Sequence, residues 1–333
     1  MNKEISQSSV SKEVPVSPKY TSQPTQTNSS AFRRYGESQY LKAPRFDQDR
    51  VWKLMDGMID VHIHSGPASA PTRVYNELEY AIQGMQVGQR AVVSKAHDGP
   101  TTRSAMIVQQ VVNQWAAENN KKPIDVFGGV VLNYAVGGLN PDAVIAAYGL
   151  RGKYVWLPSL DACYQRMVQG PEGGGGIEVI DENDRVVPAL REIMALISET
   201  DMVLGLGHQS TKERFIIVDE ARKFGLKRIE VVHTNFPLTR MTPEEAKEIA
   251  GKGVFIGLYA MSLAPPFFDF DETLNQIKAV GAENIVIASD GGHPELPSPV
   301  EGMRMLISKL INSGIPDRDI EIMIKTNPAK LLY

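Results

Sequence analysis

The run Met58-Ile59-Asp60-Val61-His62-Ile63-His64 decides the fold of this chain. Its apolar, partly β-branched residues favour a strand. Because side chains alternate between the two faces of a strand, His62 and His64 point to the same side and can bind one metal ion. A surface strand can also carry two histidines by chance, so the rest of the chain has to decide between these interpretations.

The remaining histidines repeat the same placement. The chain has 6 histidines in all, and each ends or closely follows a strand-like run. His97, His208 and His233 each follow such a run, and Asp290 ends another, with His293 three residues further on. Neutral imidazoles and a carboxylate are the ligands that zinc favours. The pattern therefore predicts a metal site assembled from strand ends.

Short apolar runs alternate with helix patterns throughout the chain after residue 50. Strands are expected over residues 58–64, 90–94, 125–132, 154–157, 202–206, 229–232, 254–258 and 285–288, and the closing helices over 299–312 and 316–332. Eight strand–helix units in about 280 residues match a (β/α)8 TIM barrel, in which all strand carboxyl ends face one mouth. A doubly wound open sheet is the competing fold, but it would spread the strand ends along a line and keep the ligands apart.

Two segments do not fit the repeat. Residues 1–50 form a low-complexity arm rich in Ser, Gln, Thr and Pro, which we expect to be disordered or extended outside the barrel domain of residues 51–333. Its spaced aromatic residues could pack on a neighbouring subunit of a homo-oligomer, or the arm is a mobile tail. After the fourth strand comes an insertion with glycines at 173–176 and a hairpin pattern over residues 177–187.

Composition excludes several classes of protein. The 333 residues carry a net charge of −4 without a basic stripe, which argues against a nucleic-acid partner. The single cysteine, Cys163, is typical of a reducing compartment and is expected to be a small apolar residue near a loop rather than a nucleophile. No stretch is long and apolar enough for a membrane span or a secretory signal, so we expect a cytoplasmic protein without a membrane partner.

The ligand pattern resembles the amidohydrolase superfamily of metal-dependent TIM-barrel hydrolases. The resemblance rests on His62-X-His64 ending strand one, His208 ending strand five, His233 ending strand six and Asp290 ending strand eight. It covers residues 57–333, and the closing Thr326-Asn327-Pro328-Ala329-Lys330-Leu331-Leu332 is similar to the C-terminal helix of many members. The chain looks closest to a poorly characterised branch with a Lys-X-His after strand two.

The ligand set has a direct chemical meaning. Three imidazoles and one carboxylate can hold Zn²⁺, or Mn²⁺ or another divalent ion, with a position left for water, whose pKa falls to about 7. Asp290 would take the proton of that water and pass it to the leaving group. His208 and His233 would bind a second ion, or His233 would be free for catalysis if there is one ion. Structural pairs, core histidines and a cap on the turn after Asp290 are the alternatives.

Lys95 decides between one and two ions. Members with two ions usually carry a bridging carboxylated lysine or glutamate at the end of strand four, and neither residue is present there. Lys95, at the end of strand two, would lose its proton when buried near cations and could become a carboxylated bridge. It could also stay charged and bind a substrate carboxylate, or form a salt bridge across the mouth.

Further residues at strand ends are candidate substrate contacts. These are His97, Trp156, Asn235, Arg240 and Tyr259. Each has packing, capping or solvent exposure as its alternative interpretation. His293 is expected to be peripheral.

The resulting hypothesis is a metal-dependent hydrolase acting on an amide, cyclic amide or ester-like bond of a small molecule. A decarboxylase with one metal ion is the alternative, because relatives of that type often have an acidic residue two positions before the first histidine, where this chain has Asp60. A non-catalytic metal-binding assembly protein is a third interpretation, which the full ligand set disfavours.

Overall fold

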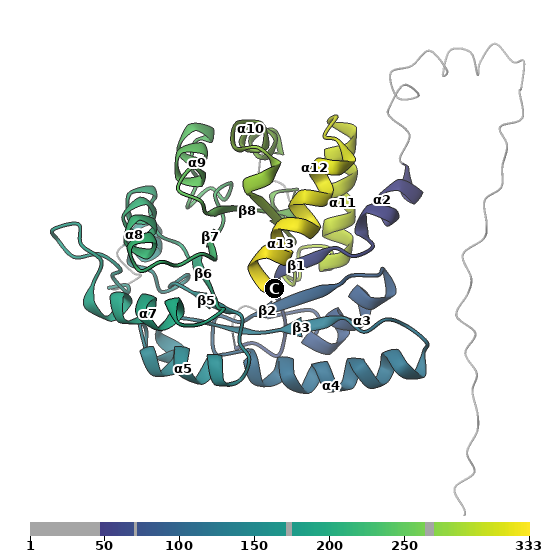
Figure 1. Cartoon of the computed structure of the whole chain (residues 1–333), viewed down its shortest axis with the longest axis horizontal. Coiled ribbons are helices and arrows are strands. Elements are labelled where there is room, and N and C mark those ends of the chain that lie inside the picture. Colours follow the sequence, from purple (N-terminus) through teal and green to yellow (C-terminus); the bar gives the residue numbers. More distant parts are fainter. Residues whose placement is uncertain (1–46, 70–71, 171–174, 264–269) are drawn as a thin grey trace, which may run out of the picture. The chain divides into compact units, whose positions relative to one another are not determined.

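Short strands alternate with helices along the described part of the chain (Figure 1). The computed structural model describes residues 47–69, 72–170, 175–263 and 270–333. The strands are β1 Ile59–His64, β2 Ala91–Lys95, β3 Asp125–Phe127, β4 Gly129–Val131, β5 Tyr154–Trp156, β6 Val203–Leu206, β7 Ile229–Val231, β8 Phe255–Tyr259 and β9 Ile285–Ala288. The helices are α2 Gln48–Met55, α3 Glu77–Gln86, α4 Thr102–Glu118, α5 Pro141–Gly149, α6 Cys163–Gln169, α7 Pro188–Ser198, α8 Thr211–Lys223, α9 Pro243–Ala250, α10 Phe270–Val280, α11 Pro299–Asn312, α12 Asp317–Glu321 and α13 Asn327–Leu332. Within these ranges, no helix is long and apolar enough to cross a membrane.

The strands form two parallel sheets. One has the order β1-β2-β3 and the other the order β4-β5-β6-β7-β8-β9, so neighbours in sequence are neighbours in space. Every pairing within the two sheets is parallel. Parallel strands joined through helices place all their carboxyl ends at one edge. The predicted α/β class is confirmed.

The two sheets approach each other at both margins. β3 and β4 are separated in sequence only by Gly128. At the other margin, the Asp290 amide donates to the His62 carbonyl at 2.9 Å, and the His64 amide donates to the Gly291 carbonyl at 2.8 Å. These main-chain bonds place the end of β1 beside the residues that follow β9. The first and last strands therefore deliver their polar residues to one place.

Gly128 divides the strand that was expected over residues 125–132. The start of α4 approaches this point, and a Cβ on Gly128 would lie 2.7 Å from the Thr101 main chain. The Thr101 hydroxyl donates to the Ser94 carbonyl at 2.7 Å and accepts from the Gly129 amide at 3.0 Å. The Thr101 hydroxyl thus takes the place of a main-chain hydrogen bond between neighbouring strands. The prediction of a continuous strand over residues 125–132 was wrong.

The closing helix is also interrupted. The sequence favoured one helix over residues 316–332, but α12 and α13 are joined by a π-helical turn, Ile322–Thr326. Pro328 lies in the first turn of α13 and has no amide hydrogen to donate. A wider turn before a proline accommodates the lost hydrogen bond.

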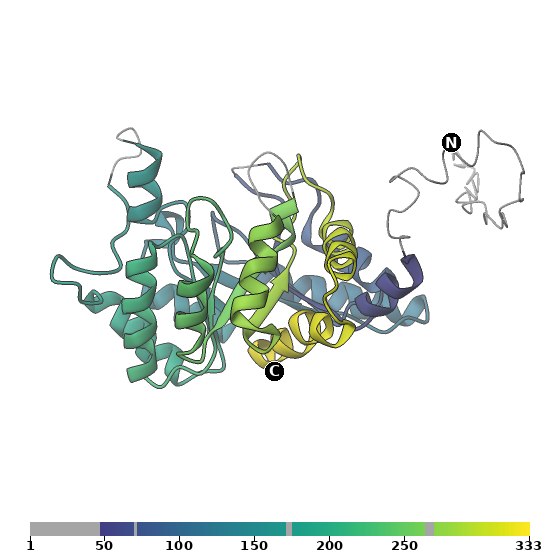
Figure 2. The ribbon, with the colours of Figure 1, turned by 90° about the horizontal axis from the view of Figure 1, so that it is seen from above.

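Helix α2 was not predicted. Asp47 caps its first turn, and Val51, Leu54 and Met55 are buried. Figures 1 and 2 show α2 beside the C-terminal helices, where Arg50 forms an ion pair with Asp317 at 2.7 Å. The helix takes in the last residues of the predicted arm. The rest of the arm, residues 1–46, lies outside the described residues.

The insertion after β5 contains a second helix that was not predicted, α6. It is followed by residues 175–187, in which Ile180 and Val186 form an antiparallel bridge, as the hairpin pattern indicated. Residues 171–174, including two of the predicted glycines, lie outside the described part of the chain. The insertion brings Gln165 of α6 to the strand ends.

Candidate metal centre

The end of β1 presents two histidines to one side. His62 is 0% and His64 is 2% exposed. The register of β1 against β2 shifts between Asp60 and Ile63, and the Asp60 carboxylate fills this irregularity by accepting from the amides of His62 (3.2 Å) and Ser289 (3.1 Å). Asp60 therefore holds the main chains of β1 and the β9 end together. The sequence correctly predicted that His62 and His64 point to the same side of the strand.

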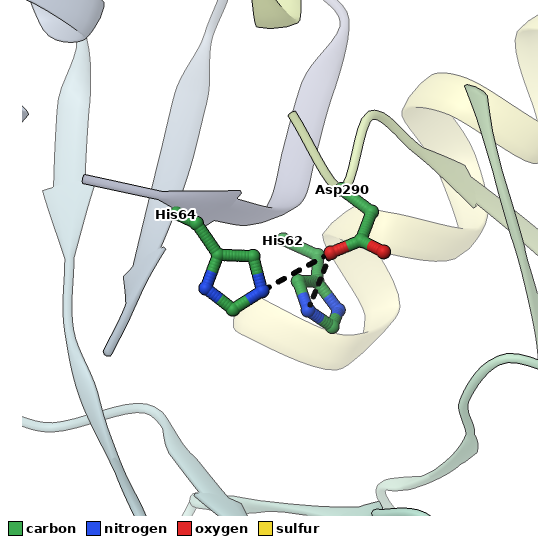
Figure 3. A group of neighbouring side chains, drawn as sticks. All are labelled: His62, His64 and Asp290. Carbon is green, nitrogen blue, oxygen red and sulfur yellow. Dashed lines mark ion pairs between the residues drawn. The ribbon is translucent and has the colours of Figure 1, made fainter. Parts of the chain in front are cut away.

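Asp290 meets both histidines through one oxygen. Its Oδ1 lies 3.1 Å from His64 Nε2 and 3.3 Å from His62 Nε2 (Figure 3). Asp290 has a positive φ of 51°, a conformation that costs energy for a residue with a side chain. The main chain is fixed there because a Cβ on Gly292 would lie 1.9 Å from the His64 carbonyl oxygen, which leaves room for glycine only. The local backbone thus holds the carboxylate against the histidines.

The protonation states of His62, His64 and Asp290 suit a bound cation. Burial, together with the nearby Lys95 charge, lowers the pKa of both imidazoles well below the usual range, so they are neutral at pH 7. Burial also raises the pKa of Asp290 to about 6. The short contacts are therefore not ion pairs between a charged imidazolium and the carboxylate, and Asp290 Oδ1 accepts no hydrogen bond from any described residue. Ligand atoms about 2.1 Å from a zinc ion at tetrahedral angles lie roughly 3.4 Å apart, close to the observed spacings.

His208 and His233 extend the group on one side. The His233 ring lies 5.3 Å from the His62 ring and 5.1 Å from the His208 ring, centroid to centroid. Its Nδ1 is 3.7 Å from Asp290 Oδ2. His208 Nδ1 bonds to Gln165 Oε1 at 2.7 Å, which leaves its Nε2 for another partner. The structure thus brings His208 and His233, which follow β6 and β7, to the His62–His64–Asp290 group.

Arg214 holds the loops that carry these two histidines, and sequence reasoning missed it. This fully buried arginine of α8 donates to the carbonyls of Thr239 and Val232 at 2.7 Å each, and to that of Gly207 at 3.3 Å. Gly207 and Val232 directly precede His208 and His233. One guanidinium therefore fixes the main chain beneath both side chains.

Lys95 lies beside the histidines. Its Nζ is 3.1 Å from His62 Nε2 and 5.5 Å from the centre of the Trp156 ring. Burial lowers the pKa of the amine to about 8, against the opposing influence of Asp290 and Glu230. A site cation bound by His62 would lie close to this amine. The amine thus lies beside His62, and its pKa is lowered but stays above 7.

Glu230 lies beneath the site and was also missed. This fully buried carboxylate of β7 accepts from the hydroxyls of Tyr154 (2.9 Å) and Tyr259 (2.8 Å). Burial raises its pKa to about 7. The Tyr259 ring stands 4.8 Å from the His62 ring and 4.7 Å from the His233 ring. Glu230 thus fixes an aromatic wall against two of the candidate ligands.

Comparison with known proteins gives a family for the chain. A model described as "Family of unknown function (DUF6282)" matches residues 57–257, the part that carries both histidines of β1, Lys95, His208 and His233. The chain belongs to this family. No curated protein matches it.

Solved structures share the fold of this DUF6282 member. A probable dipeptidase, PvdM, of Pseudomonas aeruginosa has a TM-score of 0.59 at 11% identity, over 86% of this chain and 97% of that one. An amidohydrolase of the same organism has a TM-score of 0.53 at 14% identity, over 86% and 98%. A probable 2-pyrone-4,6-dicarboxylic acid hydrolase of Acinetobacter baumannii has 0.51 at 12% identity, over 83% and 99%. The resemblance to the amidohydrolase superfamily is confirmed as a resemblance of fold, while the Lys-X-His branch stays a prediction.

The predicted substrate contacts of this DUF6282 member fall into two groups. The His97 ring stacks on the His64 ring at 4.7 Å, and Trp156 and Tyr259 are buried against His62. The other two side chains point to α10: Asn235 donates to Thr273 at 2.9 Å, and Arg240 pairs with Glu272 at 2.9 Å.

His293 lies nearer the site than we expected. Its ring is 5.8 Å from the His64 ring, although the sequence places it beyond the strand.

Cys163 begins α6 and is partly buried, and burial raises the pKa of its thiol. That shift favours the uncharged thiol over a reactive thiolate.

Proposed function

We propose that the protein is a metal-dependent hydrolase that attacks an amide, cyclic amide or ester-like bond of a small molecule with water. The observation that carries the proposal is the convergence of Asp290 Oδ1 on the Nε2 atoms of His62 and His64 in a buried site. The structural neighbours named as a dipeptidase and a hydrolase agree with this reaction class.

We also propose that the two sheets close into a (β/α)8 barrel. Main-chain bonds between the ends of β1 and β9 and the single residue between β3 and β4 support closure. In such a barrel the reaction takes place at the carboxyl ends of the strands. Each proposed ligand lies at or just after one of these ends.

The ion that suits these donors is zinc or a similar divalent ion. His62, His64 and Asp290 would hold the first ion, and His208, His233 and a carboxylated Lys95 are the proposed ligands of a second. A divalent ion at such a site supplies Lewis-acid chemistry, making water more acidic and a carbonyl more electrophilic.

The residues of the chain supply orientation and proton transfer. Asp290 faces the histidines with Oδ1, so Oδ2 is the oxygen that can accept the proton of the attacking water and return it to the leaving group. With one ion bound, His233 is free, and its Nδ1, 3.7 Å from that oxygen, can share the proton or orient the scissile carbonyl. Trp156 and Tyr259 wall the histidines with aromatic surface, which excludes bulk water.

A panel of small amides, lactams and lactones tests the reaction class. We expect the zinc-loaded protein to hydrolyse members of at least one class, with loss of activity after chelation and recovery on adding zinc back. Acid release and carbon dioxide release should be measured in parallel. Hydrolysis that is insensitive to chelation contradicts the proposal.

Carbon dioxide release from carboxylic acids, with no hydrolysis, would replace the proposal with the decarboxylase. The acidic residue that favoured this alternative is Asp60, but its Oδ1 binds two main-chain amides. It therefore acts on the backbone and offers no direct contact to a substrate through that oxygen.

A further inference from the structure

One cation near the site has no role in the proposed chemistry. Arg73 lies in the loop between β1 and α3, which is closed at its base by a bond from the Gly66 amide to the Tyr75 carbonyl at 2.9 Å. The Ser69 amide, donating to Asp98 Oδ2 at 2.5 Å, ties the same loop to the residue after His97. These two bonds tie the described residues of the loop to each other and to the residues that follow β2.

Arg73 lies near the candidate metal centre, because a Cβ built on Gly66, two residues after His64, would lie 3.4 Å from the Arg73 Cβ. Burial is the main cause of the lowered pKa of His64, His97 and Lys95, and the nearby positive charge of Arg73 adds to it. The residue is only partly exposed, and its Nη1 is buried. Arg73 thus follows the end of β1 closely and buries an unpartnered donor there.

Arg73 lacks the partner that its burial requires. Nη1 has no hydrogen-bond acceptor among the described residues, and Arg73 forms no ion pair with any of them. The two nearby carboxylates have other contacts: Asp290 faces the histidines, and Asp98 accepts from the Ser69 amide. Burying an unpaired guanidinium donor is costly, and a neighbouring site cation would repel it further.

An anion bound between Arg73 and the metal centre would accept a hydrogen bond from the unpaired donor. Its negative charge would also offset the repulsion between Arg73 and the site cation. A planar guanidinium offers two parallel donors that match the two oxygens of a carboxylate. The rings of Trp156 and Tyr259 pack against His62, whereas Arg73 lies beside Gly66, two residues after His64. A substrate bound there would present its scissile bond to the centre and its acidic group to Arg73.

We propose that the substrate carries a carboxylate and that Arg73 binds it. The substrate class is therefore a small carboxylic acid whose amide, lactam or ester-like bond lies within a few bonds of the acid group. This inference rests on the proposed function, which it narrows. Arg73 acts as a specificity determinant and takes no part in bond breaking.

Succinate and its neutral counterpart succinamide test the role of Arg73. Binding of these two compounds can be measured without knowing the substrate that the protein turns over. Using zinc-loaded protein and calorimetry, we expect wild type to bind succinate more tightly than succinamide. Arg73→Met should weaken succinate binding on the order of 10²-fold and leave succinamide binding unchanged. Arg73→Lys should recover part of the loss, because it restores the charge but not the paired donors.

Arg103→Met is the matched control. Arg103 is an exposed arginine in the first turn of α4, at the same end of the strands. Its removal should leave both affinities unchanged, and circular dichroism verifies the fold of each variant. Wild type that binds succinate no better than succinamide, or Arg73→Met that binds succinate like wild type, overturns the inference.

Metal analysis of the same samples separates this inference from the proposed function. A wild type that retains no zinc contradicts the metal-dependent hydrolase. Normal zinc content with a succinate affinity that ignores Arg73→Met contradicts only the role of Arg73.

Discussion

Asp290→Asn is expected to lower kcat/KM by about 10³-fold for whichever panel substrate the wild type hydrolyses. Asparagine keeps the size of the side chain, but its amide cannot accept and return a proton, and it adds no negative charge to the ligand set. The loss should exceed that of a residue that only shapes the pocket, because Asp290 contacts His64 at 3.1 Å and His62 at 3.3 Å through one oxygen. Steady-state kinetics on zinc-loaded protein measures the effect.

Asp142→Asn is the control for this substitution. Asp142 is an exposed aspartate in the first turn of α5, and its change should leave kcat/KM within about twofold of wild type, as expected for a surface position. Thermal unfolding verifies that both variants fold. An Asp290→Asn enzyme that keeps more than about a tenth of wild-type activity is incompatible with a proton-transfer role.

Arg214→Leu is expected to lower the free energy of unfolding by about 4 kcal/mol. Leucine would leave the carbonyls of Gly207, Val232 and Thr239 buried without their donor. A loss of this size corresponds to a fall in Tm of roughly 10 °C for a domain of this length. Denaturant unfolding followed by tryptophan fluorescence measures it.

Lys212→Met, on the same helix, is the control, because it measures how much an exposed charge contributes to the free energy of unfolding. Lys212 is 64% exposed and pairs with Asp184 at the surface, so its loss should cost less than about 1 kcal/mol. Equal stability of Arg214→Leu and wild type would mean that the three carbonyls find other donors. In that case Arg214 does not position His208 and His233.

The sequence could predict the candidate ligands because they end strands. Apolar runs locate strands, parallel strands end at one edge, and alternation fixes the parity of His62 and His64. These rules placed Lys95, His208, His233 and Asp290 in one region without any knowledge of loops.

The residues that support the ligands were harder to foresee. Gln165 lies on α6, within an insertion whose helix has no clear pattern. Arg73 depends on the path of a loop, which local sequence does not determine. For Arg214 a signal existed: it shares a helical face with Ile217, Val218 and Ala221, all of which are buried. An arginine on an apolar stripe indicates a buried charge with a specific partner.

The direct test of a metal centre is the metal content of the chain. We would reconstitute the wild type with zinc in bicarbonate buffer, remove unbound ion and determine zinc per chain by elemental analysis. The proposed centre predicts one or two ions per chain, lost in a His64→Ala, Asp290→Ala double variant that still folds. Two ions would support Lys95 as a carboxylated bridge, and one would leave His233 free for catalysis. A folded wild type that retains no zinc, nor manganese in a parallel sample, would contradict the account.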